Sequence, residues 1–186
     1  MDVDPELVRA VQRNEPGAME ALIRATHVDV HRLALRILGD PADAADATQE
    51  VFLRVMRSVV GFRGEAAFGT WLHRVTVNVC STALRRRGDA RARGQAAGFE
   101  AFAAPDSVDM TAGPDDTEGR VLQLEESSRV AIAIRDLSDD DRAVVVLRDI
   151  EGLSTREAAD VLGISEGAAK VRLHRAHAKL RAAVGG

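Results

Sequence analysis

Apolar residues recur three or four positions apart along most of the chain, which is the spacing that places side chains on one face of an α-helix. In the first half this pattern predicts four helices, a short one after Asp4 and longer ones over residues 18–38, 42–60 and 68–87. Proline and glycine near residues 16 and 40 interrupt the pattern between these helices. The sequence therefore predicts an all-α protein.

The C-terminal stretch predicts a helix-turn-helix. Ser154 is placed to cap a helix, and Glu157, three residues later, is placed to close a capping box. Gly163 suits the left-handed conformation that ends a helix, and Ser165 is placed to cap the next one. In that second helix a narrow apolar stripe is formed by Ala169, Leu173, Ala176 and Leu180.

The second helix of this motif is basic, with five basic and no acidic residues from position 168 to the end of the chain. The face opposite the apolar stripe carries Ala168, Val171 and Arg175, and the flanking residues are Lys170, Arg172, His174 and Lys179. A helix with positive charge on one side fits the major groove of DNA. The plainer interpretation is a helical hairpin with a solvated basic face, since basic residues also suit a helix C-terminus.

A further helix precedes this motif. Ser138 is placed to cap it, and three aspartates follow in its positive first turn. The apolar residues that we expect to lie beneath the helix-turn-helix are Val144, Val145, Leu147 and Ile150.

Charge divides the 186 residues into three parts. The net charge is −4; residues 1–87 and residues 128–186 each carry +1, whereas residues 88–127 carry −6. The middle part is rich in Ala, Gly and Asp and has no periodic apolar pattern until about Val121, so we expect a flexible acidic linker. The predicted architecture is two small helical domains, 1–87 and 128–186, joined by this linker, with the helix-turn-helix in the second.

The helix over residues 42–60 has one apolar side chain in an unexpected place. Leu53 lies on its outer face among charged and polar residues, which include Asp46, Gln49 and Glu50. An apolar contact ringed by charges is typical of a partner surface. The alternative is a single exposed leucine, which needs no explanation.

The helix that begins at Phe68 carries hydrogen-bond donors along its outer side, at Arg74, Asn78, Ser81 and Arg85. The row continues into Arg86 and Arg87, and such a basic end attracts phosphate. Trp71 is either a core anchor or part of a platform on which unpaired bases stack. In the glycine-containing loop before this helix, we expect Phe62 to be exposed.

Several classes of protein are excluded by what the sequence lacks. Its N-terminus has acid where a signal peptide needs base, and no apolar run approaches the roughly 20 residues of a membrane span. We therefore expect a cytoplasmic protein without membrane insertion. Its one cysteine, Cys80, excludes an internal disulfide. With no Walker-type loop and no nucleophile elbow, we expect no enzyme activity.

We also expect no metal or other cofactor. His27 and His31 lie one helical turn apart, but no third ligand is evident. Asp43, Asp46 and Glu50 lie on a helix and lack the loop geometry of a calcium site.

Three stretches carry a family resemblance: DATQEVFLRV at residues 46–55, FRGEAAFGTWLHRVTVN at 62–78 and LSTREAADVLGISEGAAKVRLHRA at 153–176. In this order and separation, they resemble the two conserved regions of bacterial RNA polymerase sigma factors of the extracytoplasmic-function (ECF) type, group IV of the sigma-70 family. The resemblance implies a protein that binds core RNA polymerase, at the β′ clamp helices and the β flap, and directs it to promoter DNA. It also implies control by an anti-sigma factor.

The resemblance assigns roles to individual residues. For polymerase binding it selects Asp46, Gln49, Glu50 and Leu53. For the −10 element it selects Phe62 and Arg63 of the specificity loop, followed by Trp71, Arg74, Asn78 and Arg85. For the −35 element it selects Lys170, Val171, Arg172 and Arg175.

This chain departs from the family pattern at two places. Ala47 stands where leucine is usual, and Ala168-Ala169 stands where Thr-Val is usual, so a hydroxyl contact and a larger core anchor are lost. The base preference is therefore left open. The alternative functions are a stand-alone helix-turn-helix regulator that binds duplex DNA and, ranked far lower, a nucleic-acid-modifying hydrolase that uses the acidic helix.

Overall fold

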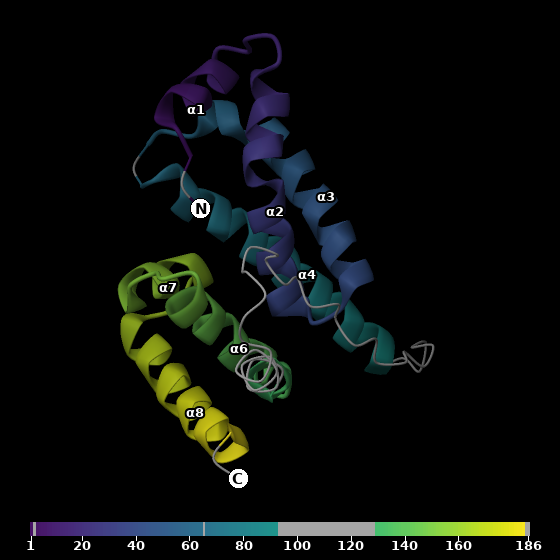
Figure 1. The fold of residues 1–186 in the computed structure, drawn as a ribbon, viewed down its shortest axis with the longest axis vertical. Coiled ribbons are helices and arrows are strands. Elements are labelled where there is room, and N and C mark those ends of the chain that lie inside the picture. The colour runs from purple at the N-terminus through teal and green to yellow at the C-terminus, as the bar shows by residue number, and fades with distance from the viewer. Residues whose placement is uncertain (2, 65, 93–128, 185–186) are drawn as a thin grey trace, which may run out of the picture.

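A computed structural model describes residues 1, 3–64, 66–92 and 129–184, and within these ranges every regular element is helical (Figure 1). The first half contains α1 (Pro5–Gln12), α2 (Ala18–Leu38), α3 (Pro41–Ser58), the 3-10 turn η1 (Val59–Gly61) and α4 (Phe68–Ala92). In the second half, residues 129–135 are helical and are followed by α6 (Asp139–Val145), the π-helical turn η2 (Val146–Ile150), α7 (Thr155–Leu162) and α8 (Glu166–Val184). The all-α prediction is confirmed.

Most of the predicted linker lies outside the described residues, since these omit 93–128. Helix α4 continues to Ala92, through the first residues assigned to the linker. The domain boundaries at residues 87 and 128 therefore stay predictions.

The helices of the first half begin and end where local chemistry places their boundaries. Asp4 caps α1 by accepting from the amide of Glu6 at 2.8 Å, and Asp40 caps α3 by accepting from Asp43. Gly39 adopts a φ of 68° and ends α2, a conformation that costs glycine little. Side chains from α2, α3 and α4 form most of the core, and the fully buried ones include Leu22, Leu33, Ile37, Val51, Val55 and Leu72.

The predicted helix-turn-helix is confirmed as α7 and α8. Ser154 and Glu157 form a capping box at the start of α7, and Gly163 ends it with a φ of 66°. The Ser165 hydroxyl accepts from the amide of Ala168 at 3.1 Å and caps α8. The apolar stripe of α8 packs inward as expected, with Ala169, Leu173 and Ala176 buried.

One core prediction of the second half is wrong. Val144, Val145 and Leu147 are buried, but Ile150 is 38% exposed. It ends the π turn η2, in which the amide of Glu151 donates to the carbonyl of Val146, five residues back. The wider turn shifts the helical phase, so Val146 is fully buried and Ile150 is turned outward.

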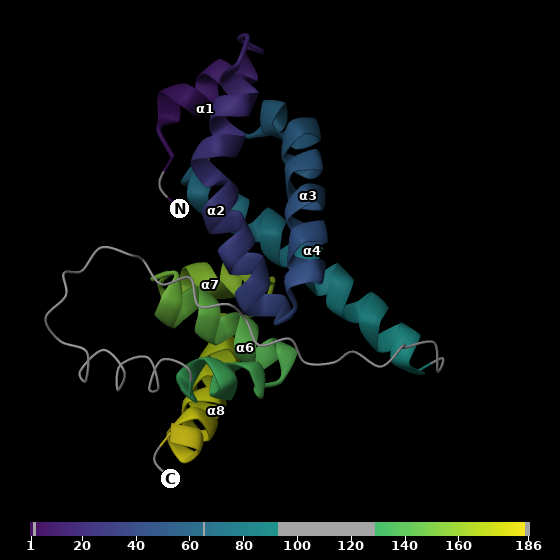
Figure 2. The same ribbon diagram turned by 45° about the vertical axis from the view of Figure 1, so that its right-hand side comes forward.

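The two halves pack against each other. Helix α6 lies beside the lower, C-terminal end of α2, and α7 lies beside the part of α4 that contains Arg74 (Figure 1, Figure 2). The apolar core of the first half continues into the second through Val146, Leu147, Leu153, Ala158 and Val161. Burying these side chains holds the halves together in the described structure.

Arg142 of α6 joins the halves through hydrogen bonds. Its side chain is 10% exposed, and its Nη1 donates to the carbonyl of Ile37 in α2 at 2.7 Å. Its other nitrogens donate to the carbonyls of Ile134, Arg135 and Leu137. Desolvation by burial lowers the pKa of Arg142, which stays a cation because carbonyl oxygens surround it.

We predict that Arg142→Ala destabilises the protein. The substitution leaves buried carbonyl oxygens without donors, which costs roughly 1–3 kcal/mol. Urea unfolding followed by circular dichroism measures the change in the free energy of unfolding. Arg148→Ala is the matched control, because Arg148 lies in η2 with a side chain 46% exposed. Equal unfolding midpoints for the two variants would contradict a structural role for Arg142.

Candidate partner and nucleic-acid interfaces

The outer face of α3 exposes the four residues predicted to bind a partner. Leu53 is 41% exposed, Asp46 and Gln49 are also exposed, and Glu50 is half-buried. Glu50 accepts a hydrogen bond from Arg54 at 2.7 Å, which lowers the pKa of the Glu50 carboxyl. Thr48, Val51 and Phe52 face inward and are buried, so the predicted helical phase is confirmed.

A groove between α2 and α3 adds residues to this face. It has a volume of about 500 Å³ and is lined by His27, His31, Ala45, Thr48, Gln49, Phe52, Leu53 and Met56. The rings of His27 and Phe52 stack with centroids 6.0 Å apart, and those of His27 and His31 with centroids 6.3 Å apart. The sequence did not predict that His27 and His31 line a groove, nor that Met56, which is 43% exposed, belongs to it. Apolar spacing along one helix does not reveal that a second helix completes a groove.

The loop before α4 differs from the expectation. Phe62 is half-buried rather than exposed, because its ring packs on Phe68 at 5.3 Å and on Trp71 at 5.6 Å. Its carbonyl accepts from the side chain of Gln12 at 2.7 Å, which ties the loop to α1. Trp71 is half-buried in this aromatic cluster, so it contributes to the core and still exposes part of its ring.

The predicted row of donors along α4 is exposed, as is Arg63 in the loop before it. The row consists of Arg74, Asn78, Ser81 and Arg85. Arg74 is not free in the described structure, since its Nη2 donates to the carbonyl of Asp160 in α7 at 3.2 Å. The remaining N–H groups of Arg74 stay available, but α7 lies against the donor row at this position.

Glu151 makes a further polar contact between the halves. Its carboxylate pairs with Arg36 of α2 at 2.8 Å and with the Nε2 of His73 of α4 at 3.3 Å. Burial raises the pKa of the Glu151 carboxyl, but the hydrogen bond and charge of His73, together with Arg36, lower it by more, so the pKa is lowered overall. The Nδ1 of His73 is buried without a hydrogen-bond partner among the described residues. The polar contacts from the second half to the first thus come from Arg142 of α6, from Glu151 directly after η2 and from Asp160 of α7.

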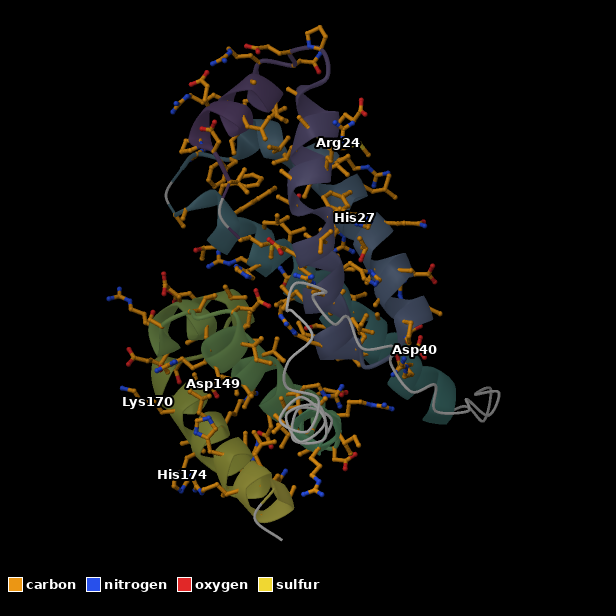
Figure 3. All side chains as sticks on the ribbon, in the orientation of Figure 1. Arg24, His27, Asp40, Asp149, Lys170 and His174 are labelled. Carbon is orange, nitrogen blue, oxygen red and sulfur yellow. The ribbon has the colours of Figure 1, made fainter. Side chains whose placement is uncertain are left out.

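The recognition-helix candidates lie on the outer side of α8. Val171 is 63% exposed, and Lys170 pairs with Glu166 one turn earlier at 2.7 Å. Lys170 and His174 point away from the rest of the protein (Figure 3). Arg172 is more enclosed, with a side chain 25% exposed that pairs with Asp140 of α6 at 3.0 Å.

Arg175 forms the most extensive ion pair of α8. Its Nε donates to both carboxylate oxygens of Asp141 at 3.0 Å, and its Nη2 donates to one of them. Lys179 donates to the same carboxylate at 3.2 Å. The hydrogen bond from Arg175, with that from Lys179, lowers the pKa of Asp141 to about 2 even though burial opposes the shift. The sequence did not show this pair, because the two residues are 34 positions apart.

Among the described residues, no three His, Cys, Asp or Glu side chains gather into a group able to hold a metal ion. None of the helices in the described ranges is both long and apolar enough to cross a membrane.

Two conserved regions of the sigma-70 family match separate parts of the chain. Sigma-70 region 2 matches residues 22–90, which contain α3 and most of α2 and α4. Sigma-70, region 4, matches residues 129–180, which contain the helix-turn-helix. The groove and the donor row lie in the first match, and the Arg175–Asp141 pair lies in the second.

Two curated relatives match over most of the chain. "ECF RNA polymerase sigma factor SigE" of Mycolicibacterium smegmatis is 37% identical over 162 residues, which cover 87% of this chain and 60% of that protein. "ECF RNA polymerase sigma factor SigM" of Mycobacterium tuberculosis is 34% identical over 182 residues, which cover 98% of this chain and 85% of that protein. The chain thus spans less than two thirds of the first relative and most of the second.

Two solved structures are similar to the whole chain. CnrH in complex with the cytosolic domain of CnrY has a TM-score of 0.64 at 26% identity, over 97% of this chain and 96% of that one. The sigma factor RpoE from Bartonella quintana, in complex with the anti-sigma factor NepR, has a TM-score of 0.72 at 18% identity, over 91% of this chain and 98% of that one. The second likeness concerns the fold alone.

The ion pairs of Asp141 predict a pH dependence of stability. Because the folded pKa is lowered to about 2 from an unfolded value near 3.9, the stabilisation is present above about pH 4 and is lost as pH falls toward 2. Asp141→Asn should lower the melting temperature at pH 7, and its difference from wild type should shrink between pH 4 and pH 2. Thermal unfolding at several pH values measures this difference.

Asp140→Asn is the control, because Asp140 lies in the same turn with a side chain 67% exposed. It should stay close to wild type throughout. A difference for Asp141→Asn that did not vary with pH would show that packing, rather than charge, is what the substitution disturbs.

Proposed function

The chain belongs to the extracytoplasmic-function sigma factors of the sigma-70 family, and from this premise we propose that it binds core RNA polymerase and directs it to specific promoters. Its relatives are sigma factors, a class that initiates transcription without catalytic activity of its own. In the proposed function each of the two matched regions supplies a separate binding surface.

The observation that carries the proposal is the groove between α2 and α3. Leu53 and Met56 are more than 40% exposed beside the stacked rings of His27 and Phe52. Charged and polar residues surround this apolar centre, as they do in interfaces that bury a contact from water. A regulator that binds DNA alone needs no such surface, whereas a polymerase subunit does. We propose that the β′ clamp helices bind here.

We propose that α4 and the loop before it hold the melted −10 element. Arg63, Arg74, Asn78 and Arg85 supply exposed donors for the backbone and bases of one strand. The exposed part of Trp71 supplies a ring on which a base can stack. Phe62 contributes from within the aromatic cluster, where its ring supports that of Trp71.

We propose that α8 reads the −35 element. Lys170, Val171, Arg172 and Arg175 lie on or beside its outward face, and the second helix of a helix-turn-helix enters the major groove. The β flap is the polymerase surface that holds this half in place.

The contact between the halves must open for both surfaces to act together. Arg74 donates to the carbonyl of Asp160 in the described structure, so α7 lies against the donor row and limits the access of DNA to it. Docking of both halves on polymerase replaces their mutual contacts and holds the −10 and −35 surfaces at a fixed separation. Two weak sites then act at a high effective concentration.

We further propose that an anti-sigma factor controls this chain. The similar sigma factor RpoE was solved with the anti-sigma factor NepR, and CnrH was solved with the cytosolic domain of CnrY. A partner that covers the groove between α2 and α3 would exclude polymerase directly.

We predict that Leu53→Ala weakens polymerase binding without unfolding the protein. Removing an exposed side chain should change the free energy of unfolding by less than about 0.5 kcal/mol. Loss of a central interface contact should weaken binding roughly tenfold. Binding to core polymerase and melting temperature are measured on the same samples. Val60→Ala is the matched control, because Val60 is 68% exposed and lies outside the groove.

Two outcomes would count against this assignment. A large fall in the melting temperature of Leu53→Ala would show that Leu53 is a core residue. Equal polymerase binding by the wild type and by Leu53→Ala would show that another surface meets polymerase.

We predict that Arg74→Ala combined with Asn78→Ala impairs the opening or holding of the melted strand while −35 recognition is retained. Promoter binding is compared for the free protein and for the polymerase complex, on closed duplex and on a template already unpaired at −10. The free protein should bind duplex weakly. Arg24→Ala is the control, since Arg24 is an exposed cation of α2 that pairs only with Glu20 among the described residues.

The same measurements of promoter binding also test the alternative function. Tight and specific duplex binding by the free protein, unchanged by polymerase, would favour a stand-alone helix-turn-helix regulator. It would count directly against a promoter-specificity subunit.

A further inference from the structure

Arginine has two edges that can each donate two parallel hydrogen bonds, and in Arg175 one of them is occupied. The Nε and one N–H of Nη2 form the side edge, and both point at Asp141. The outer edge consists of the second N–H of Nη2 and one N–H of Nη1. Among the described residues none accepts a hydrogen bond from Nη1. The ion pair therefore leaves a complete donor pair available.

The carboxylate that holds Arg175 is firmly placed. The Asp141 side chain is fully buried in the first turn of α6, and its amide donates to the Ser138 hydroxyl at 3.3 Å. Lys179 binds the same carboxylate from the next turn of α8. By contrast, the Arg175 side chain is 52% exposed. A buried anion thus fixes the direction of a half-exposed cation.

Arg175 lies one helical turn after Val171, an apolar side chain that is 63% exposed. Residues four apart share a face of a helix, so both belong to the outward side of the helix-turn-helix. On a base pair in the major groove, guanine presents two acceptors, O6 and N7, that match the outer edge of an arginine.

We infer that Asp141 is a positioning residue for DNA reading, which holds Arg175 so that its outer edge meets the O6 and N7 of one guanine. The inference rests on the proposed function, since it requires that α8 enter the major groove. It assigns a specificity role to a buried acidic residue that does not touch DNA. An arginine already held in its binding orientation loses less conformational entropy when it binds.

Charge alone predicts the opposite effect of removing Asp141. A carboxylate near DNA repels phosphates, so its loss should strengthen binding to every sequence. Positioning predicts instead that the preference for one guanine is lost. The two explanations are separated by measuring sequence preference and overall affinity together.

The experiment uses the full chain with core RNA polymerase and a set of duplex promoters carrying every single-base substitution across the −35 element. Wild type should prefer guanine at one position roughly tenfold or more over the other bases. Asp141→Asn should lose most of that preference at this position alone. Asp140→Asn is the matched control: it removes a charge from the same turn but releases Arg172 and not Arg175, so it should keep the preference at this base pair and bind all sequences slightly more tightly.

Arg175→Lys keeps the test decisive if Asp141→Asn does not fold. Lysine has one ammonium group, which can pair with Asp141 or contact a guanine but cannot present two edges. It replaces a half-exposed side chain, so the fold is retained, and it should lose preference at the same base pair. The melting temperature of each variant is measured first.

The inference is overturned if Asp141→Asn tightens binding to all sequences as Asp140→Asn does, or if Arg175→Lys keeps the wild-type preference. Failure of the proposed function is seen separately, in the wild-type arm. If wild type with polymerase shows no base preference across the −35 element, α8 does not read this element and the inference fails with it.

Discussion

The first turn of α6 is the point on which the arrangement of the second half depends. The free amides of a helix N-terminus favour negative charge, and this turn carries three consecutive aspartates behind the Ser138 cap. Each aspartate has a different cationic partner: Asp139 pairs with Arg142, Asp140 with Arg172 and Asp141 with Arg175. The turn therefore fixes α8 on one side. Through Arg142, which donates to Ile37, it also fixes α2 on the other.

The same turn couples packing to function. Arg142 is buried, and its Nη1 finds the carbonyl of Ile37 only where α6 lies against the C-terminal end of α2, so this hydrogen bond and the shared apolar core support one another. Separating the halves exposes Val146 and Leu147, together with the buried faces of α2 and α4 that they cover. A partner that opens the protein must therefore replace apolar contacts as well as ion pairs. Polymerase offers such a replacement because it binds both halves in the proposed function.

Helix caps and apolar periodicity, which act over a few residues, predict much of the fold. Contacts between residues far apart in the sequence cannot be predicted in this way. Ser154, Glu157 and Gly163 act within one helix and its end, so the bounds of α7 follow from the sequence. The burial of Val51 and the exposure of Leu53 follow from helical periodicity. Ile150 was misplaced because a π turn adds a residue to the helical repeat, and no local residue preference marks that insertion.

The candidate site was predictable as a set of helix faces but not as a set of contacts. Phe62 was expected to be exposed because it lies in a glycine-containing loop, whereas its burial depends on Phe68 and Trp71 beneath it. The groove needs His27 from a different helix. The pairing of Arg175 with Asp141 joins positions 34 residues apart, and only the assembled α6 and α8 bring them together.

The ion pairs of α8 reduce the attraction for non-specific DNA that its basic sequence predicts. From the sequence alone, the cations of α8 should attract DNA of any sequence. In the structure, four of these cations form ion pairs with acidic side chains. The pairs are Lys170 with Glu166, Arg172 with Asp140, and both Arg175 and Lys179 with Asp141. Partly neutralised cations attract phosphate weakly, which lowers affinity for non-specific DNA more than affinity for a site where donors also meet base edges. A protein carried to promoters by polymerase does not need strong non-specific attraction of its own. What it needs is a high ratio of specific to non-specific binding, and neutralisation within the protein raises that ratio.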